Sequence, residues 1–290
     1  NSGYLDYIYL HMPHITLKYI DFVKGLRGPK ILYFGHDLHY MRLRRQYEVS
    51  KDLSILKEAE FWEEKELSIF KKADAVYYPS IVEVDEIKKR LPDVCARAIP
   101  LYIYEEIRSA EHGFQERRDL LFVGGFRHHP NVDAVSWFVE EIFPVILARD
   151  ASIKINIVGS NMPDAIRKMA SDNIIIAGEV SDAELHALYH NCRVVVVPLR
   201  YGAGIKGKVL EALELQVPIV TTDIGAEGLP DAENYLAVAD DVYDFAESVL
   251  ELYTDIDLWK EKADKGREAL VRFFSKDCAY QIMKKDIQFH

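Results

Sequence analysis

The stretch Pro198-Leu-Arg-Tyr-Gly-Ala-Gly-Ile-Lys-Gly-Lys-Val-Leu-Glu-Ala-Leu213 decides the fold that we expect for this chain. The apolar run Val194–Val197 before it predicts a buried strand, and the segment 208–215 at its end predicts a helix. Between them lie three glycines and two lysines, Lys206 and Lys208. A strand, a glycine-rich turn and a helix N-terminus favour anion binding, because free backbone N–H groups and the helix dipole face the turn.

A second glycine-rich loop follows the next predicted strand. The strand is Pro218–Thr222, and the loop is Asp223-Ile-Gly-Ala-Glu-Gly-Leu229. Ligands of open α/β sheets bind beyond the carboxyl ends of the strands, so two such loops on adjacent strands predict one shared crevice. For an isolated glycine-rich motif the alternative is a tight turn with solvated lysines, because short motifs match by chance.

Composition limits the class of protein. The 290 residues suggest about two domains, and the net charge of −11 argues against a nucleic-acid partner. The sequence has no run of 18 apolar residues and no signal-peptide pattern at its start. The three cysteines, Cys95, Cys192 and Cys278, are far apart, which fits a reducing, cytoplasmic setting. Because the first residue is not Met, we expect a processed, tagged or partial chain.

Alternating strands and helices predict an α/β fold with parallel, doubly wound sheets. The first third has predicted strands at 7–10, 30–34, 75–78 and 98–103, with helices at 53–72 and 82–90. The polar segment 108–118 is predicted to be a linker. After it, strands are predicted at 120–123, 154–158, 174–176, 194–197, 218–222 and 235–238, with helices at 132–147, 164–170, 181–190, 208–215, 241–253, 257–274 and 276–287.

From Leu120 to Phe274 the chain resembles the retaining glycosyltransferases of family 4, also called group 1, which have the GT-B architecture. The resemblance rests on the motifs Leu121–Gly125, Pro130–Ala134, Ile157–Gly159, Pro198–Arg200, Gly202–Gly204, Lys206–Ala212, Pro218–Val220 and Ile224–Gly228. It implies two Rossmann-like domains, with residues 1–112 forming an acceptor-side domain and 113–274 a nucleotide-sugar-binding domain. Residues 275–290 would form a helix that crosses back onto the N-terminal domain.

The resemblance implies transfer of a sugar, with retention, from a nucleotide diphosphate-sugar to an acceptor hydroxyl, in bacterial polysaccharide or glycoconjugate synthesis. It implies no metal and no cofactor, and a saccharide or lipid-linked acceptor. From the cysteines we expect a cytoplasmic location, and from the basic cluster 42–45 peripheral contact with the inner face of the membrane. His36 would act at the donor sugar. The expected nucleotide and diphosphate ligands are Arg127, Arg200, Gly204, Lys206, Lys208 and Glu211, and the expected donor-sugar loop is Gly225, Ala226, Glu227 and Gly228.

The chain departs from the family pattern in three places. The first glutamate of the E-x7-E motif, which contacts donor-sugar hydroxyls in the family, is replaced by Ala203. In the loop after the first strand of the C-terminal domain, only Arg127 remains of an expected Arg and Lys. Four predicted strands stand before the linker, where the family has six or seven. We therefore expect a fragment or, less favoured, a minimal acceptor domain.

Two other functions remain as alternatives. Ala203 and the short N-terminal domain are compatible with a non-catalytic GT-B module that binds nucleotides or serves as a scaffold in a larger protein. A dinucleotide oxidoreductase is disfavoured, because no G-x-G-x-x-G follows the first strand of the C-terminal domain.

Further polar clusters have more than one interpretation. His36, Asp37 and His39 could be an acid–base pair, a metal cluster or loop residues. The basic cluster 42–45 could meet an anionic lipid-linked acceptor or a membrane, or be a solvated helix face. The D-x-D sequence Asp255-Ile-Asp257 precedes a predicted helix, and N-capping is the favoured role for it.

Overall fold

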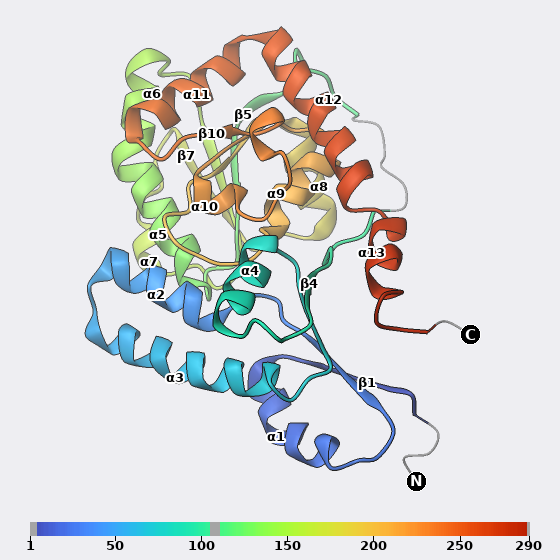
Figure 1. Ribbon diagram of the computed structural model, residues 1–290. Helices are drawn as coiled ribbons and strands as arrows, with labels where there is room; N and C mark the ends of the chain where they lie inside the picture. Colours follow the sequence, from blue (N-terminus) through green and yellow to red (C-terminus); the bar gives the residue numbers. More distant parts are fainter. Residues whose placement is uncertain (1–4, 105–110, 289–290) are drawn as a thin grey trace.

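The computed structural model describes residues 5–104 and 111–288. It consists of two lobes, each built on its own sheet (Figure 1). The N-terminal lobe contains strands β1 to β4, and the C-terminal lobe contains β5 to β10. All strand pairings among the described residues are parallel, as predicted. The predicted linker at 108–118 lies partly outside the described residues.

The N-terminal lobe has a four-stranded sheet of order β1-β2-β3-β4. Its elements are β1 (Tyr7–His11), α1 (Pro13–Lys24), β2 (Lys30–Phe34), α2 (His39–Ser50), α3 (Leu53–Phe70), β3 (Ala75–Tyr78), α4 (Ile81–Arg90) and β4 (Ala96–Ala98). The prediction of a strand at 98–103 was wrong. The strand ends before Pro100, since a proline has no N–H with which to continue the pairing. The sequence reasoning also missed α1 and α2.

Helices cover both faces of this sheet. Tyr33 and Tyr78 pack on one face against α3 and α4. Phe34 and Tyr77 point to the other face, where they pack with Ala279 of α13 (Lys276–Met283). This alternation follows from the period of two along each strand.

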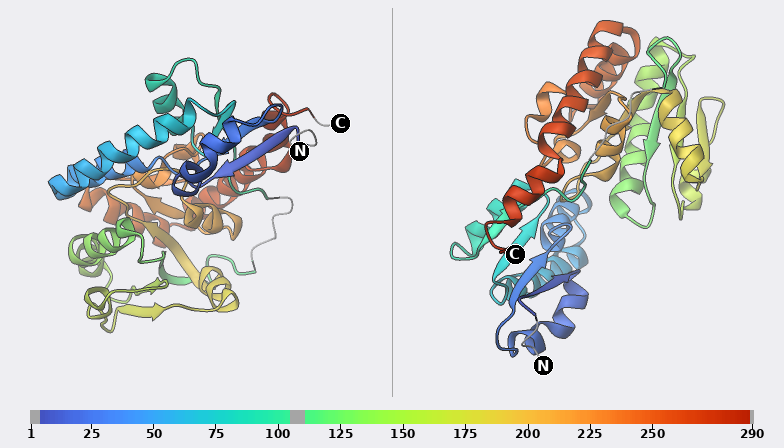
Figure 2. Two further views of the ribbon diagram at one scale, coloured as in Figure 1. Left: turned by 90° about the horizontal axis from the view of Figure 1, so that it is seen from below. Right: turned by 90° about the vertical axis from the view of Figure 1, so that its right-hand side faces the viewer.

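The C-terminal segment returns to the N-terminal lobe, as the resemblance implied. The right-hand view of Figure 2 shows α12 running from the C-terminal lobe toward the N-terminal lobe, where the chain continues into α13. Beyond α13, the Asp286 carboxylate accepts hydrogen bonds from Arg97 Nε and Nη2 at 2.7 Å each, and from the Tyr77 hydroxyl at 2.7 Å. Burial opposes ionisation of Asp286, but these hydrogen bonds outweigh it and lower its pKa.

The C-terminal lobe has a six-stranded sheet of order β10-β9-β8-β5-β6-β7. Its elements are β5 (Arg118–Val123), α5 (His129–Trp137), a π-helical turn (Phe138–Ile142), α6 (Phe143–Arg149), β6 (Ile155–Val158), α7 (Asp164–Arg167), β7 (Ile174–Gly178), α8 (Asp182–Asn191), β8 (Cys192–Val197), α9 (Gly207–Glu214), β9 (Ile219–Thr221), α10 (Asp223–Ala226), a 3-10 turn (Ala232–Asn234), β10 (Ala237–Val238), α11 (Val242–Thr254) and α12 (Ile256–Phe273). The strand order reverses between β5 and β8, which is where doubly wound sheets bind their ligands.

The local sequence explains how individual helices begin and bend. Asp255 caps α12 by accepting hydrogen bonds from the backbone N–H groups of Asp257 and Leu258 at 2.9 and 3.0 Å, which confirms the N-cap interpretation. The helix predicted at 132–147 is interrupted by the π-helical turn that leads into α6. Pro144 lies at the start of α6, where its missing N–H breaks the regular hydrogen-bond ladder.

The last residue before β5 is buried, although the sequence analysis placed it in a polar linker. Arg117 is fully buried. Its guanidinium donates to the backbone carbonyl groups of His112, Tyr189, Cys192 and Leu215, at 2.9, 2.7, 3.2 and 3.1 Å. Arg117 therefore joins the start of β5 to the ends of α8 and α9 by supplying hydrogen-bond donors to four buried or partly buried carbonyl groups.

We predict that Arg117→Lys lowers the free energy of unfolding of the C-terminal lobe by roughly 2–4 kcal/mol, since one ammonium cannot reach all four carbonyl groups. Urea denaturation measures the change. Arg118→Lys is the matched control, because Arg118 is exposed, and it should change stability by less than about 0.5 kcal/mol. Equal effects of the two substitutions would show that the buried contacts do not contribute as described.

Candidate donor-binding site

The glycine-rich loop 198–206 connects the buried strand β8 to the N-terminus of α9. Lys206 is the N-cap residue of α9, and no side chain caps this helix. The first N–H groups of the helix are therefore available to an anion, and the helix dipole adds about half a positive charge there. Lys208 lies one residue inside the helix, so two ammonium groups accompany these N–H groups.

Lys208 is held in place by residues of the neighbouring strand and loop. Its Nζ donates to Asn131 Oδ1 at 2.6 Å and lies 4.5 Å from the centre of the Phe122 ring. A Cβ atom at Gly124 would come within 2.8 Å of Lys208 Nζ and 2.7 Å of Asn131 Cγ. Because Gly124, which follows β5, has no Cβ, it leaves room for the side chains of Lys208 and Asn131.

Burial changes the ionisation of both lysines. It lowers the pKa of Lys206 to about 8. It lowers the pKa of Lys208 to about 7, and the nearby charge of Lys206 adds to the effect. An anion that binds between these groups restores the charged forms, because an opposite charge favours ionisation. A bound diphosphate would therefore stabilise the charged forms of Lys206 and Lys208.

Glu211 lies one turn into α9, on the side of Tyr189. The Tyr189 hydroxyl donates to Glu211 Oε2 at 3.1 Å, which fixes the orientation of the carboxylate. Tyr102, in the segment after β4, reaches the start of the same helix, since a Cβ at Gly207 would lie 2.6 Å from its hydroxyl oxygen. The expected role of Glu211 in holding the ribose stays a prediction.

The two arginines of the predicted diphosphate site are placed differently from the lysines. Arg200 forms a bidentate ion pair with Asp133 of α5. Its Nε and Nη2 donate to the two carboxylate oxygens at 2.9 and 2.5 Å. Its charge is therefore already partly neutralised. Arg127 is exposed in the loop between β5 and α5. Phosphate contacts by these two residues stay predictions.

His36 lies directly across from the glycine-rich loop. It is exposed just after β2, and its ring centre is 5.4 Å from that of Phe34. Gly204 has φ +71°, and a Cβ there would come within 2.8 Å of the His36 carbonyl oxygen. Glycine is therefore required at residue 204 both by the backbone conformation and by the close approach of the two lobes. The catalytic role of His36 stays a prediction.

The polar neighbours of His36 interact with the N-terminal lobe itself. Asp37 accepts from Arg42 Nε at 2.8 Å. His39 Nδ1 lies 3.2 Å from Glu66 Oε1, and Glu66 is fully buried. Burial lowers the pKa of His39, but the hydrogen bond to Glu66 and the charge of Asp37 outweigh this effect and raise it. Asp37 and His39 thus hold the start of α2, the helix that carries the basic cluster 42–45.

The expected donor-sugar loop, Gly225–Gly228, lies at the end of α10 and faces the N-terminal lobe. Glu227 Oε2 is 2.5 Å from Arg45 Nη2, and Arg45 Nη1 also donates to the Gly202 carbonyl at 2.7 Å. A Cβ at Gly228 would come within 2.5 Å of Ser80 Oγ. One arginine of the N-terminal lobe therefore contacts both glycine-rich loops of the C-terminal lobe.

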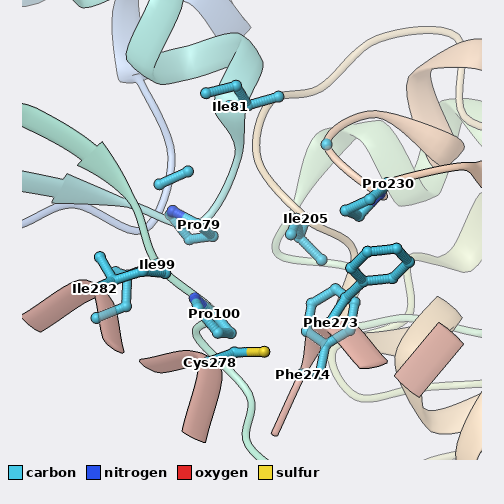
Figure 3. Close-up of a pocket in the computed structure, with 12 residues that line it drawn as sticks. Pro79, Ile81, Ile99, Pro100, Ile205, Pro230, Phe273, Phe274, Cys278 and Ile282 are labelled. Atoms are coloured by element: carbon cyan, nitrogen blue, oxygen red, sulfur yellow. The ribbon is translucent and has the colours of Figure 1, made fainter. Parts of the chain in front are cut away.

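One apolar pocket adjoins both loops, and a second lies beside His36. The first, of about 250 Å³, lies between the lobes (Figure 3), and its lining comes from β4, both loops, the end of α12 and α13. It includes Pro79, Ile99, Pro100, Ile205, Pro230, Phe273, Phe274, Cys278 and Ile282. The other, of about 400 Å³, extends along the N-terminal sheet from Tyr9 to His36. Neither lining contains a lysine or an arginine, so neither suits a diphosphate.

Sequence reasoning found the lysines and both loops but missed the groups that hold them. Asn131 lies within a motif noted above, although no role was assigned to it. Glu83 was missed. Asp133, in the same motif, and Arg45, in the basic cluster 42–45, were noted without their partners, which lie far away in the sequence.

Comparison with known families finds a match in the C-terminal lobe. Residues 117–255 match the family described as Glycosyl transferases group 1. This segment, just under half of the 290 residues, is similar to group 1 glycosyltransferases. The chain is also 28% identical, over 153 residues, to an uncharacterised 44.6 kDa protein in the cps region of Klebsiella pneumoniae, with 50% of this chain and 39% of that protein covered.

Solved structures similar to this chain have the GT-B glycosyltransferase fold. TarM is similar with a TM-score of 0.78 and 17% identity, over 96% of this chain and 54% of TarM. The sucrose-phosphate synthase of Thermosynechococcus elongatus is similar with a TM-score of 0.77 and 16% identity, over 97% of this chain and 72% of the synthase. The chain thus spans about half of TarM and about two fifths of the Klebsiella protein. These likenesses confirm the expected fold.

Among the described helices, none combines the length and the apolar character needed to cross a bilayer.

We predict that the affinity for UDP or GDP falls as the pH rises from 7.5 to 9.5. The two lysines lose their protons in and below this range unless a diphosphate holds them charged, so binding at high pH must take up protons. Calorimetric titration at a series of pH values measures the effect, which we expect to be about tenfold or more. Lys208→Arg should flatten the profile, since arginine stays charged. An unchanged affinity across the range would exclude charged lysines from the binding site.

Proposed function

We propose that the chain is a glycosyltransferase that moves a sugar, with retention, from a nucleotide diphosphate-sugar to an acceptor hydroxyl. The observation that carries the proposal is the uncapped N-terminus of α9, with Lys206 and Lys208, at the crevice between the two parallel sheets. The similarity to group 1 glycosyltransferases supports the same chemistry.

The leaving diphosphate is the part of the reaction that this site can stabilise. As the bond between the sugar and the diphosphate breaks, negative charge grows on the phosphate oxygens. Preorganised N–H groups and ammonium groups stabilise such charge in a site with little water. Lys206, Lys208 and the N-terminus of α9 supply these groups in our proposal, so that the reaction proceeds without a metal ion. Glu211 holds the ribose, and His36 lies near the transferred sugar.

The acceptor enters from the N-terminal lobe in this proposal. The pocket of about 400 Å³ next to His36 has an aromatic and aliphatic lining that includes Tyr9 and Tyr77. Aromatic faces pack against sugar rings and apolar chains alike, which supports a saccharide or lipid-linked acceptor. A mutant of S. aureus TarM has been crystallised in complex with UDP, fondaparinux and α-GlcNAc-glycerol. The location of the Klebsiella relative in a cps region supports a role in polysaccharide synthesis. Peripheral contact with the inner face of the membrane, and a cytoplasmic location, remain part of the proposal.

A non-catalytic GT-B module is the second candidate, and one observation favours it. Residue 203 is an alanine where the resemblance leads us to expect a glutamate. A module of this kind would bind a nucleotide without transferring a sugar.

The test is incubation of the purified chain with UDP-glucose, UDP-N-acetylglucosamine or GDP-mannose in the presence of EDTA. We expect release of nucleoside diphosphate, by slow hydrolysis or by transfer to an added acceptor. NMR of the first-formed product should show the anomeric configuration of the donor. Nucleotide binding without any turnover would favour the non-catalytic module.

Lys208→Ala should weaken the binding of the nucleoside diphosphate by about ten- to a hundredfold, because it removes a charge-assisted hydrogen bond of roughly 1.5–3 kcal/mol. Calorimetry measures the dissociation constant. Lys260→Ala removes the same charge from an exposed position on α12 and should change the affinity less than twofold. If both variants bind like the unmodified chain, the diphosphate does not lie at α9.

A further inference from the structure

Two acidic and two basic side chains meet where the lobes touch. Arg45 and Glu83 come from the N-terminal lobe, and Lys206 and Glu227 come from the glycine-rich loops of the C-terminal lobe. Arg45 binds Glu227 Oε2, and Lys206 donates to the Gly204 carbonyl. We call this group the inter-lobe charge cluster.

Two oxygens of the inter-lobe charge cluster have no hydrogen-bond partner. They are Glu83 Oε2 and Glu227 Oε1, and both are shielded from solvent. Glu83 is fully buried, and the Glu227 side chain is only 8% exposed. Folded proteins rarely leave a buried carboxyl oxygen unpaired, because the lost hydration is not replaced. Two such oxygens in the crevice expected to hold a ligand indicate groups that the ligand satisfies.

The hydrogen bond that Glu83 makes is not the one expected from its position in α4. The pattern Ser80-x-x-Glu83 at the start of α4 predicts a capping box, in which the glutamate would bond back to the Ser80 N–H. Ser80 does cap α4, with its Oγ accepting from the Val82 N–H at 3.1 Å. Glu83 Oε1 instead accepts from the Leu38 N–H at 2.8 Å. Glu83 is thus turned away from the cap and toward the loop that carries His36.

The charges in the cluster select the kind of ligand. Burial raises the pKa of Glu83 to about 8, against the effect of the Leu38 N–H, so its carboxyl group is mostly protonated at neutral pH and can donate a hydrogen bond. Glu227, paired with Arg45, is an acceptor. An anion would be repelled by Glu227, and a cation by Arg45 and Lys206. A neutral group with hydroxyls, which both donate and accept, matches the pair of carboxyl groups.

We propose that Glu83 and Glu227 form the subsite for the hydroxyl groups of the donor sugar. This proposal rests on the proposed function and adds Glu83 of the N-terminal lobe to the expected donor-sugar loop, which already contains Glu227. Ala203 has no polar side-chain atom. Glu83 supplies a hydroxyl contact from the opposite lobe, and Glu227 supplies one from the second glycine-rich loop of the same lobe. Because both oxygens are shielded, the lobes part to admit the sugar and close on it. Arg45 positions Glu227 and the Gly202 carbonyl in the closed arrangement.

The test compares the affinity for a nucleotide-sugar with the affinity for the free nucleoside diphosphate, and the ratio of the two is the sugar contribution. UDP with UDP-glucose, and GDP with GDP-mannose, are the probes, measured by calorimetry. We expect Glu83→Ala and Glu227→Ala each to reduce the sugar contribution by roughly three- to tenfold, the effect of one lost hydrogen bond. The affinity for the free diphosphate should change less than twofold. A purely structural role would change the diphosphate affinity and the melting temperature instead.

Three controls keep the result interpretable. Glu83→Gln retains an oxygen for the Leu38 N–H and a neutral donor, and it should restore most of the sugar contribution. Asp85→Ala removes an exposed acid from the same helix and should have no effect. A deoxy-sugar donor lacks the contacted hydroxyl, so the contact is already absent. In this double-mutant cycle the alanine variants and the unmodified chain should therefore bind the deoxy-sugar donor with equal affinity.

The outcomes separate this proposal from the proposed function. An unchanged sugar contribution in both alanine variants, or an unmodified chain that binds the diphosphate and its sugar conjugate equally, would overturn the subsite alone. An unmodified chain that binds none of the probes would overturn the proposed function and the subsite with it.

Discussion

The parallel direction of the strands is the constraint on which the site depends. In a parallel sheet all carboxyl ends lie along one edge, and loops that follow different strands are gathered there. Both sheets of this molecule are parallel, and their carboxyl edges face each other. His36 after β2, the glycine-rich loop after β8 and the loop 225–228 after β9 therefore meet, although they are far apart in the sequence. The crevice between the lobes is a result of topology before any particular side chain is considered.

The close approach of the two lobes and the burial of charged groups determine the properties of the crevice. Glycine at residue 204 lets the backbone of one lobe touch that of the other. Burial lowers the pKa of Lys206 and of Lys208. It also leaves two carboxyl oxygens without partners. The site therefore contains unfavourable electrostatic interactions that a ligand with a diphosphate and hydroxyl groups would relieve.

The sequence predicted the parts of the fold that depend on local patterns. The apolar runs before Gly124 and Pro198 predicted buried strands, and the turn chemistry after them predicted the loops. Helices α1 and α2 were missed, because their apolar positions are divided between exposed and buried faces and no capping side chain marks their starts. The strand expected at 98–103 was misplaced, since the apolar residues there line the pockets between the lobes instead of pairing.

The site was predictable only in part, for the same physical reason. Lysines next to a glycine-rich turn can be recognised from a local pattern. The pair of Arg45 with Glu227 joins two lobes, and the bond from Leu38 to Glu83 joins two loops of one lobe. Such contacts depend on the relative placement of distant elements, which local patterns do not specify. Ser80-x-x-Glu83 even predicts a different partner for Glu83, so here the local pattern was misleading.

The central claim is that a nucleoside diphosphate lies at the N-terminus of α9, between the two lobes. A crystal structure of the chain with UDP or GDP bound tests this most directly. We predict phosphate oxygens within hydrogen-bond distance of the first N–H groups of α9 and of Lys208, with the ribose next to Glu211. A nucleotide bound with its phosphates elsewhere on the protein, and with α9 unoccupied, would contradict it.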